Sequence, residues 1–176
     1  LVSGKRDEPL AIFGWLGLLR DVTIVDNEIS ASGASFGIAA YSIDNKNHTG
    51  RLSHVRIQEN TIYGGNTGGI GVKGGAESVF IDNNIILNTR KDGIFLHPGG
   101  ALLPPVRRVD VHRNSIRNAG RHGIFATGLD ISIFENEISS CSEAGVYAAG
   151  TNIVVKCNKI ADSLPGILII GDQIEV

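Results

Sequence analysis

The stretch "VTIVDNEI", residues 22–29, recurs with small changes along the whole chain. The later copies read VRIQENTI, VFIDNNII, VDVHRNSI, ISIFENEI and IVVKCNKI. Each copy contains one asparagine, and the set is Asn27, Asn60, Asn84, Asn114, Asn136 and Asn158. The shortest step between consecutive members is 22 residues, so the chain is built from a repeat of that base length.

A second motif, Gly followed by Ile or Val, comes 8 to 10 residues after each asparagine. One repeat therefore reads V-x-I-x-x-N-x-I, a short loop, G-I-x-V and a second loop. The alternation in V-x-I places its apolar residues on one side of a strand. Strands this short bury their inward side chains only by stacking on a neighbouring coil. No stretch repeats apolar residues at helical spacing over three turns, so the pattern does not indicate helices.

The stacked repeat predicts a structural role for each recurring residue of the motif. We interpret the asparagine as a corner residue, because Asn tolerates the left-handed backbone and its amide can form a ladder with the coils above and below. The glycine before the next Ile would allow another corner. We expect two inward files of side chains, one formed by Ile24, Ile57, Ile81, Val111, Ile133 and Val155, the other by Ile38, Ile70, Ile94, Ile124, Val146 and Ile167.

This repeat resembles that of right-handed parallel β-helices, the superfamily of pectate lyases, polygalacturonases, alginate lyases and epimerases, and phage tailspikes. The resemblance covers residues 14–170, with Gly14 taken as the corner glycine of an earlier coil. It implies an all-β fold, a single parallel β-helix domain over residues 1–176 with about six coils. The chain lacks an initiator Met, and "GDQIEV" at 171–176 begins a further coil. We therefore expect an uncapped C-terminal end and a longer parent protein.

Composition excludes several classes of function. The net charge of −2 comes without a block of like charge, so neither nucleic acid nor a membrane surface is an expected partner. No apolar run is long enough to span a membrane. Cys141 and Cys157 give no disulfide framework, and no metal-binding spacing or cofactor motif is present. We expect no cofactor, and a secreted, cell-surface or virion-like setting.

Residues after the inward Ile point outward and form two predicted columns. The first contains Leu16, Ala39, Gly71, Phe95, Phe125, Tyr147 and Leu168, and the second contains Leu18, Tyr41, Lys73, His97, Thr127, Ala149 and Ile170. Phe95, Phe125 and Tyr147 make an apolar strip, which we expect to contact a polysaccharide ligand, a flanking domain or a second copy of the chain. Asp92 and His122 precede the glycines of adjacent coils. We expect them to stack, to pair and to join this ligand-binding surface.

The long connections at 42–53 and 98–107 flank the short, glycine-rich stretch "GIGVKGGAES" at 69–78 and predict a groove. Tyr41, Lys73 and His97 would lie at its floor and rims, and Arg107 would end one wall. These residue types suit proton abstraction beside a uronate carboxylate, with Lys or His as base, Arg to stabilise charge and Tyr as acid. The Lys73 charge should lower the pKa of His97, unless an acidic group such as Asp44 or Glu77 reaches it.

Comparison with the enzymes that the repeat resembles counts against catalysis. The outward carboxylates that hold calcium in pectate lyases are absent from the matching columns. The paired aspartates, Gly-His-Gly and Arg-x-Lys of polygalacturonases are absent too, and "DGIFLHPGG" at 92–100 is only similar to the Asp-Pro-His region of mannuronan epimerases. The leading hypothesis is a scaffold module that binds carbohydrate or a partner chain in an extracellular or phage-like assembly. The alternative is a polysaccharide lyase or epimerase acting on acidic glycans.

Overall fold

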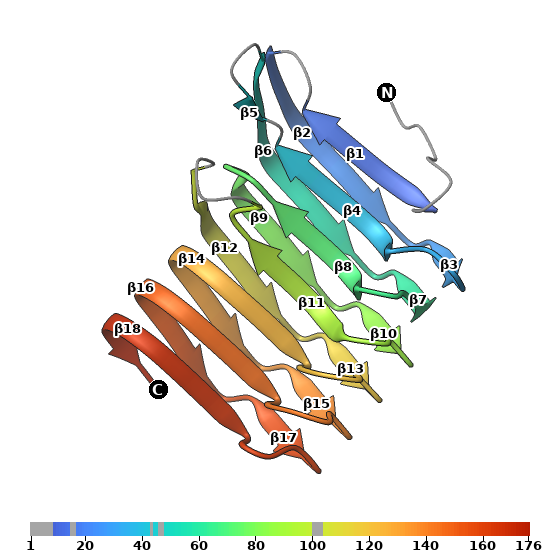
Figure 1. Cartoon of the computed structure of the whole chain (residues 1–176), viewed down its shortest axis with the longest axis vertical. Helices are drawn as coiled ribbons and strands as arrows, with labels where there is room; N and C mark the ends of the chain where they lie inside the picture. The colour runs from blue at the N-terminus through green and yellow to red at the C-terminus, as the bar shows by residue number, and fades with distance from the viewer. Residues whose placement is uncertain (1–8, 15–16, 43, 46–47, 100–103) are drawn as a thin grey trace.

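The computed structural model describes residues 9–14, 17–42, 44–45, 48–99 and 104–176. In these ranges parallel strands stack into a coil with three faces (Figure 1). None of the described residues forms an α-helix, and no helix there could cross a membrane. The all-β prediction is therefore confirmed.

Each face is built from one strand of every coil. Three long strands cross a corner and belong to both the first and the second face: β14 (Ile124–Phe134), β16 (Val146–Lys156) and β18 (Ile167–Glu175). The first face also contains β1 (Leu10–Gly14), β4 (Phe36–Ser42), β8 (Gly68–Lys73) and β11 (Asp92–His97). The second face also contains β2 (Gly17–Val25), β6 (His48–Gln58), β9 (Glu77–Asp82) and β12 (Val106–His112). The third face contains β3 (Glu28–Ala31), β7 (Thr61–Gly64), β10 (Ile85–Leu87), β13 (Ser115–Arg117), β15 (Glu137–Ser139) and β17 (Lys159–Ala161).

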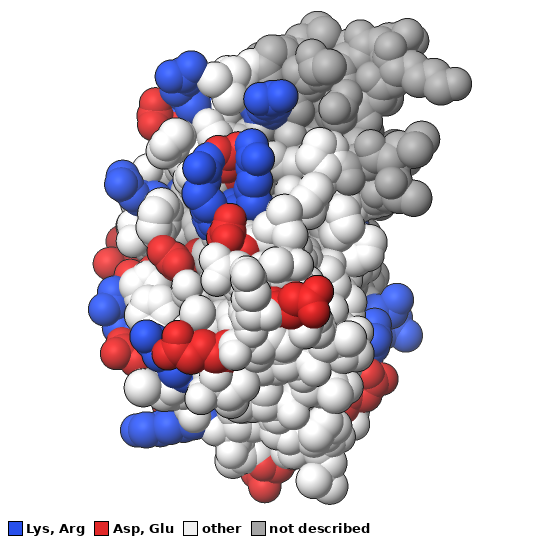
Figure 2. All heavy atoms as spheres, turned by 90° about the vertical axis from the view of Figure 1, so that its left-hand side faces the viewer, with Lys and Arg blue, Asp and Glu red and all other residues white. Residues whose placement is uncertain are grey.

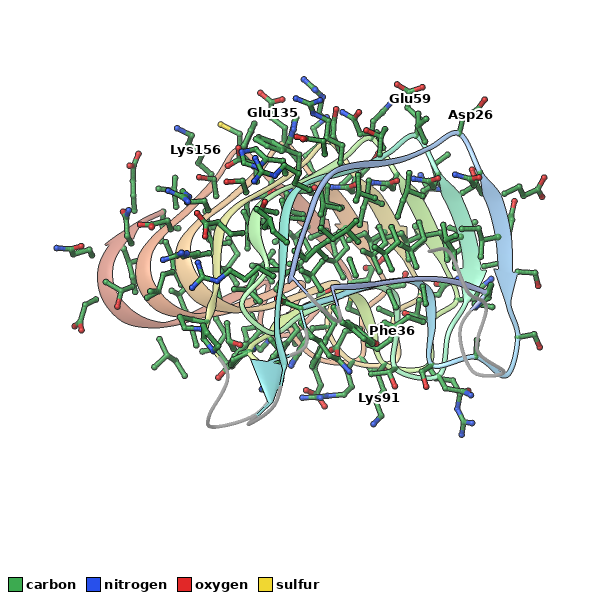
Figure 3. The ribbon with its side chains drawn as sticks, turned by 90° about the horizontal axis from the view of Figure 1, so that it is seen from above. Asp26, Phe36, Glu59, Lys91, Glu135 and Lys156 are labelled. Carbon is green, nitrogen blue, oxygen red and sulfur yellow. The ribbon has the colours of Figure 1, made fainter. Side chains whose placement is uncertain are left out.

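Both predicted inward files are confirmed. The parallel register runs without a slip from Ile24 to Val155 in the first file. It runs in the same way from Ile38 to Ile167 in the second file. Every member is buried apart from Ile167, which is 38% exposed on the last strand. Figure 3 shows, from above, that side chains fill the interior of the coil.

The asparagine ladder is confirmed, but the predicted backbone role of its members is wrong. The four central members, Asn60, Asn84, Asn114 and Asn136, are buried and bonded to one another. The left-handed residue at each corner is the one before the asparagine, with φ between 51° and 57° at Asp26, Glu59, Asn83, Arg113, Glu135 and Cys157. The chain turns at that residue, and the next side chain then points inward, where its amide bonds the neighbouring coil.

The corner glycines are required for space and not for a left-handed backbone. Gly37, Gly69, Gly93, Gly123 and Gly145 do not have positive φ angles. A Cβ built on any of these five would lie 2.4 Å from Cγ2 of an isoleucine on the third face. Only glycine therefore lets the first and third faces approach this closely.

The first coil begins earlier in the chain than predicted. β1 pairs Leu10 with Ile38 and Ala11 with Ala39, so Leu10 and not a residue after Gly14 takes the inward position. Leu16 lies outside the described residues, and Leu18 pairs with Arg51 on the second face, so Leu18 does not continue the outward column. The connection between β1 and β2 is longer than in the shortest repeats from which Gly14 was assigned.

The connection at 42–53 is not simply a loop. β5 (Asp44–Asn45) pairs antiparallel with the first residues of β6, which starts at His48. Residues 43, 46–47 and 100–103, which belong to the two predicted walls of the groove, lie outside the described residues.

Candidate ligand-binding surface

The outer side of the first face carries a column of polar side chains from three adjacent strands. The register places Tyr41 beside Lys73 and Lys73 beside His97, as predicted. Three aromatic rings surround the Lys73 ammonium, with centres 4.8, 4.9 and 5.5 Å from Nζ in Phe36, Tyr41 and Phe95 respectively. Contacts of this kind stabilise the charged form of lysine. Lys73 is therefore suited to be a fixed cation, not a base.

His97 is arranged as a hydrogen-bond donor. Its Nδ1 accepts the backbone N–H of Gly99 at 2.9 Å, so the neutral ring carries its proton on Nε2. Burial, followed by the charge of Lys73, lowers the pKa of His97 from its ordinary value of 6.5. The predicted direction is confirmed, although burial is the larger cause. A base needs a lone pair to accept a proton, and in this arrangement the lone pair of Nδ1 is already used.

Arg107 does not lie in the same column as those three residues. It is on β12 of the second face, where its Nε donates to Oε2 of Glu77 at 2.9 Å. The guanidinium of Arg108 binds the other carboxylate oxygen of the same glutamate. The four residues predicted to share one catalytic centre are thus divided between the outward column and a separate hollow.

That hollow is a groove of about 340 Å³ whose lining includes Ser42, Arg51, Gly75, Glu77, Pro104 and Arg107. These lining residues come from the three segments that predicted a groove, but Tyr41, Lys73 and His97, which were expected at its floor and rims, are not among them. Figure 2 shows charged side chains of both signs along the upper and left-hand parts of this side, while the lower central part is mostly uncharged. The groove therefore offers guanidinium groups to a ligand, and the column offers an ammonium.

The predicted aromatic strip lies on the outside of the coil as a stack. The ring centres of Phe95 and Phe125 are 5.3 Å apart with planes 14° from parallel, and those of Phe125 and Tyr147 are 4.9 Å apart with planes 2° from parallel. All three rings are half-buried. Because they stack face to face, they present edges to a ligand or partner, and their faces are largely occupied by one another.

Sequence reasoning missed Phe36, which is buried in a small cluster with Ala11 and Ala39, against which Tyr41 and Phe95 pack. Its ring centre lies 5.9 Å from that of Phe95. A Cβ built on Gly71 would be 2.7 Å from the Phe36 ring, so this ring fills the place that glycine leaves empty in the outward column. Gly71 could have indicated this contact from the sequence, because a glycine in a column of large side chains leaves space for a neighbouring side chain.

Asp92 and His122 contact each other, but both are buried and the contact is made by the backbone. Oδ1 of Asp92 accepts the N–H of His122 at 3.3 Å, and Oδ2 has no partner in the described part of the chain. Burial raises the pKa of Asp92 to about 6. The His122 ring stacks on Phe125 and Tyr147, and its Nε2 lies 3.3 Å from Glu143. Burial also lowers the pKa of His122. Asp92 and His122 are therefore better placed to support the aromatic strip than to contact a ligand directly.

In the described ranges, no group of three or more His, Cys, Asp or Glu side chains is placed to hold a metal ion.

Residues 99–174, less than half of the chain, match the family model described as the right-handed β-helix region. No curated protein and no solved structure matches the chain. The strand register continues unchanged from the matched segment toward the N-terminus. The family match and the coiled parallel sheets together place the chain in the right-handed parallel β-helix superfamily.

Proposed function

We propose that this chain is a non-catalytic β-helix module that binds an acidic polysaccharide at the outward column of Tyr41, Lys73 and His97. The observation that carries the proposal is the fixed ammonium of Lys73 among three aromatic rings, beside a histidine whose outer nitrogen is a donor. Ligand carboxylates form their strongest hydrogen bonds with charged donors of this kind.

The composition of the column supports an anionic ligand. Beyond its three polar members the column continues through Thr127, Ala149 and Ile170, none of which carries a negative charge. The strands that carry it are held by buried inward files, so the donors are fixed before the ligand arrives. The adjacent ring edges of the aromatic strip would supply apolar contact for the ligand or for a partner chain.

Three features argue for binding without catalysis. Nδ1 of His97 is occupied by the N–H of Gly99, the rings favour the charged form of Lys73, and Arg107 is paired with Glu77 on another face. Proton abstraction would require a base with an open lone pair within reach of the substrate.

Isothermal titration calorimetry with oligouronates tests the proposal, with the methyl-esterified oligosaccharides as the neutral comparison. We expect binding only of the acidic form, weakening as salt increases. Lys73→Gln should weaken binding about tenfold or more, since a charge-assisted bond is worth roughly 1.5–3 kcal/mol. The matched control is Lys91→Gln, because Lys91 is exposed and points away from the coil (Figure 3). Equal binding of both ligand forms, or an unaffected Lys73→Gln variant, would contradict the proposal.

The adjacency of Tyr41, Lys73 and His97 favours a polysaccharide lyase or epimerase as the second candidate. That activity requires His97 to release the N–H of Gly99 when the substrate binds. Unsaturated uronate in the reaction mixture, or inverted sugar centres in the recovered polymer, would establish it.

A further inference from the structure

We infer that the groove lined by Arg51 and Arg107, next to the outward column, is a second anionic subsite, and that Glu77 of the chain itself competes with the ligand for it. This inference rests on the proposed function. The ligand would extend from the column at Lys73, past Gly74 and Gly75, into the groove. It predicts a module that selects acidic chains by their length.

The groove already holds a carboxylate, that of Glu77. Both Nε and the terminal nitrogen Nη2 of Arg107 donate to Oε2 of Glu77, and Arg108 binds Oε1. A guanidinium offers several N–H donors in one plane to a carboxylate, whereas an ammonium acts as a point charge. Glu77 thus shows which chemical group this part of the groove recognises.

Positive charge exceeds negative charge at this place. Arg51 and Arg107 line the groove, Arg108 contacts its glutamate, and Glu77 is the one acidic residue among those that line it in the described part of the chain. Arg107 and Arg108 are 49% and 57% exposed at their side chains, so both can turn toward a ligand. Two guanidinium groups line the groove against one carboxylate, and the groove therefore attracts a further anion.

The column and the groove are joined by residues that are close in the chain. Ser42 in the groove follows Tyr41 in the column, and Gly75 in the groove comes two residues after Lys73. At about 3.3 Å per residue, the Cα atoms of Lys73 and Gly75 are within about 7 Å of each other. The intervening Gly74 turns the chain with φ +71°, and Gly75 lies against Pro104, which a Cβ would approach to 3.1 Å. Neither glycine places a side chain in the ligand's path.

A ligand that reaches both places gains from their connection. Once one carboxylate is held by Lys73, the next ones are delivered to the groove at a high effective concentration. Short acidic ligands should then bind through the column alone, and longer ones through both subsites.

The test is the affinity of an oligouronate series from disaccharide to octasaccharide, measured for matched variants. Wild-type affinity should rise with length by about tenfold or more. The Arg51→Gln/Arg107→Gln variant should keep its affinity for the shortest binding ligand and lose the increase. Glu77→Gln should strengthen the binding of long ligands, the opposite direction. Arg117→Gln, exposed on β13 of the third face, is the matched control and should match the wild type.

The outcomes separate the two proposals. If the double variant retains the full increase with length while its thermal unfolding is unchanged, the second subsite is wrong and the column proposal stands. If the Glu77→Gln variant binds long ligands no better than the wild type, Glu77 does not compete with the ligand. If the wild type binds no member of the series, both the second subsite and the proposed function are wrong.

Discussion

Oδ1 of Asn84 accepts two hydrogen bonds from Asn60, one from its backbone N–H and one from its side-chain amide, each 3.0 Å long. The same two bonds join each later pair of ladder asparagines through to Asn158. Because the corner before each asparagine interrupts the strand ladder, the side chain supplies the hydrogen bond that the backbone lacks there. Each coil is thus tied to the next by the residue that marks the repeat.

Asn84→Ala should therefore destabilise the coil by about 1–3 kcal/mol, the cost of leaving buried groups unpaired. The Asn84 amide also donates to the carbonyl oxygens of Ile57 and Asp82, and these would lose a partner as well. Denaturant-induced unfolding gives the free-energy difference. Asn27→Ala, at the exposed end of the ladder, should cost clearly less. Equal losses at both positions would show that the ladder is not a source of stability.

The glycine packing predicts a specific rescue. Gly69→Ala should destabilise by about 1–3 kcal/mol, because its Cβ would lie 2.4 Å from Cγ2 of Ile86. In the Ile86→Ala background the same change should cost much less, giving a measurable coupling energy in a double-mutant cycle.

Gly33→Ala is the contrasting variant for this prediction. Gly33 has φ +87° and nothing within 4 Å of a built Cβ, so its substitution meets backbone strain without a clash. Ile86→Ala should not rescue it. Additive effects of Gly69→Ala and Ile86→Ala would mean that the close contact does not set the glycine requirement.

Asp92 should make stability depend on pH in the opposite direction from a surface carboxylate. Burial raises its pKa in the folded state from 3.8 to about 6, so the folded protein binds this proton more tightly than the unfolded chain. The stabilisation is fully present below the unfolded pKa and is lost as pH rises through about 6. The shift corresponds to at most about 3 kcal/mol.

The measurement compares unfolding free energies of the wild type and Asp92→Asn between about pH 3.5 and pH 7.5. The variant removes this titration and keeps an oxygen for the N–H of His122. Relative to the variant, the wild type should lose stability as the pH increases. A difference that stays constant across the range would show that Asp92 is not titrating in this window.

His97 should respond to the ligand through its charge. Its pKa lies below 6.5 because of burial and the neighbouring Lys73, and Lys73→Gln should raise that pKa partway back. A bound oligouronate adds negative charge and should raise it further. The ring signals of His97 in an NMR titration report both changes, with exposed His54 of the second face as internal reference. A His97 pKa that is the same with and without saturating oligouronate would place the bound acidic groups elsewhere.

The sequence was sufficient to predict the coil, its inward files and the asparagine ladder, since each depends on side chains that recur at a period. The files from Ile24 and Ile38 follow from alternation alone, and a one-residue slip would have exposed them. The start of the first coil could not be predicted in this way. The connection between β1 and β2 is longer than in the shortest repeats. Gly14 precedes Val22 by the spacing found in those repeats, although it is not the corner glycine of this coil.

The candidate site was predicted only in part. The adjacency of Tyr41, Lys73 and His97 was predicted correctly, because it follows from the register of neighbouring strands. The ring of Phe36 over Gly71, the bond from Gly99 to His97 and the pairing of Arg107 with Glu77 depend on where side chains turn after they leave the backbone. A linear pattern carries none of that information, and our proposal of binding without catalysis depends on these three contacts.

The most direct test of the central claim is one incubation of the chain with a panel of acidic polysaccharides, followed at the same time by binding and by the absorbance of unsaturated uronates. The account predicts saturable binding of at least one acidic polysaccharide, weakened in the Lys73→Gln variant, with no increase in absorbance and the polymer recovered unchanged. An absorbance that grows with time and enzyme concentration, and that is lost in His97→Gln, would contradict it and establish a lyase.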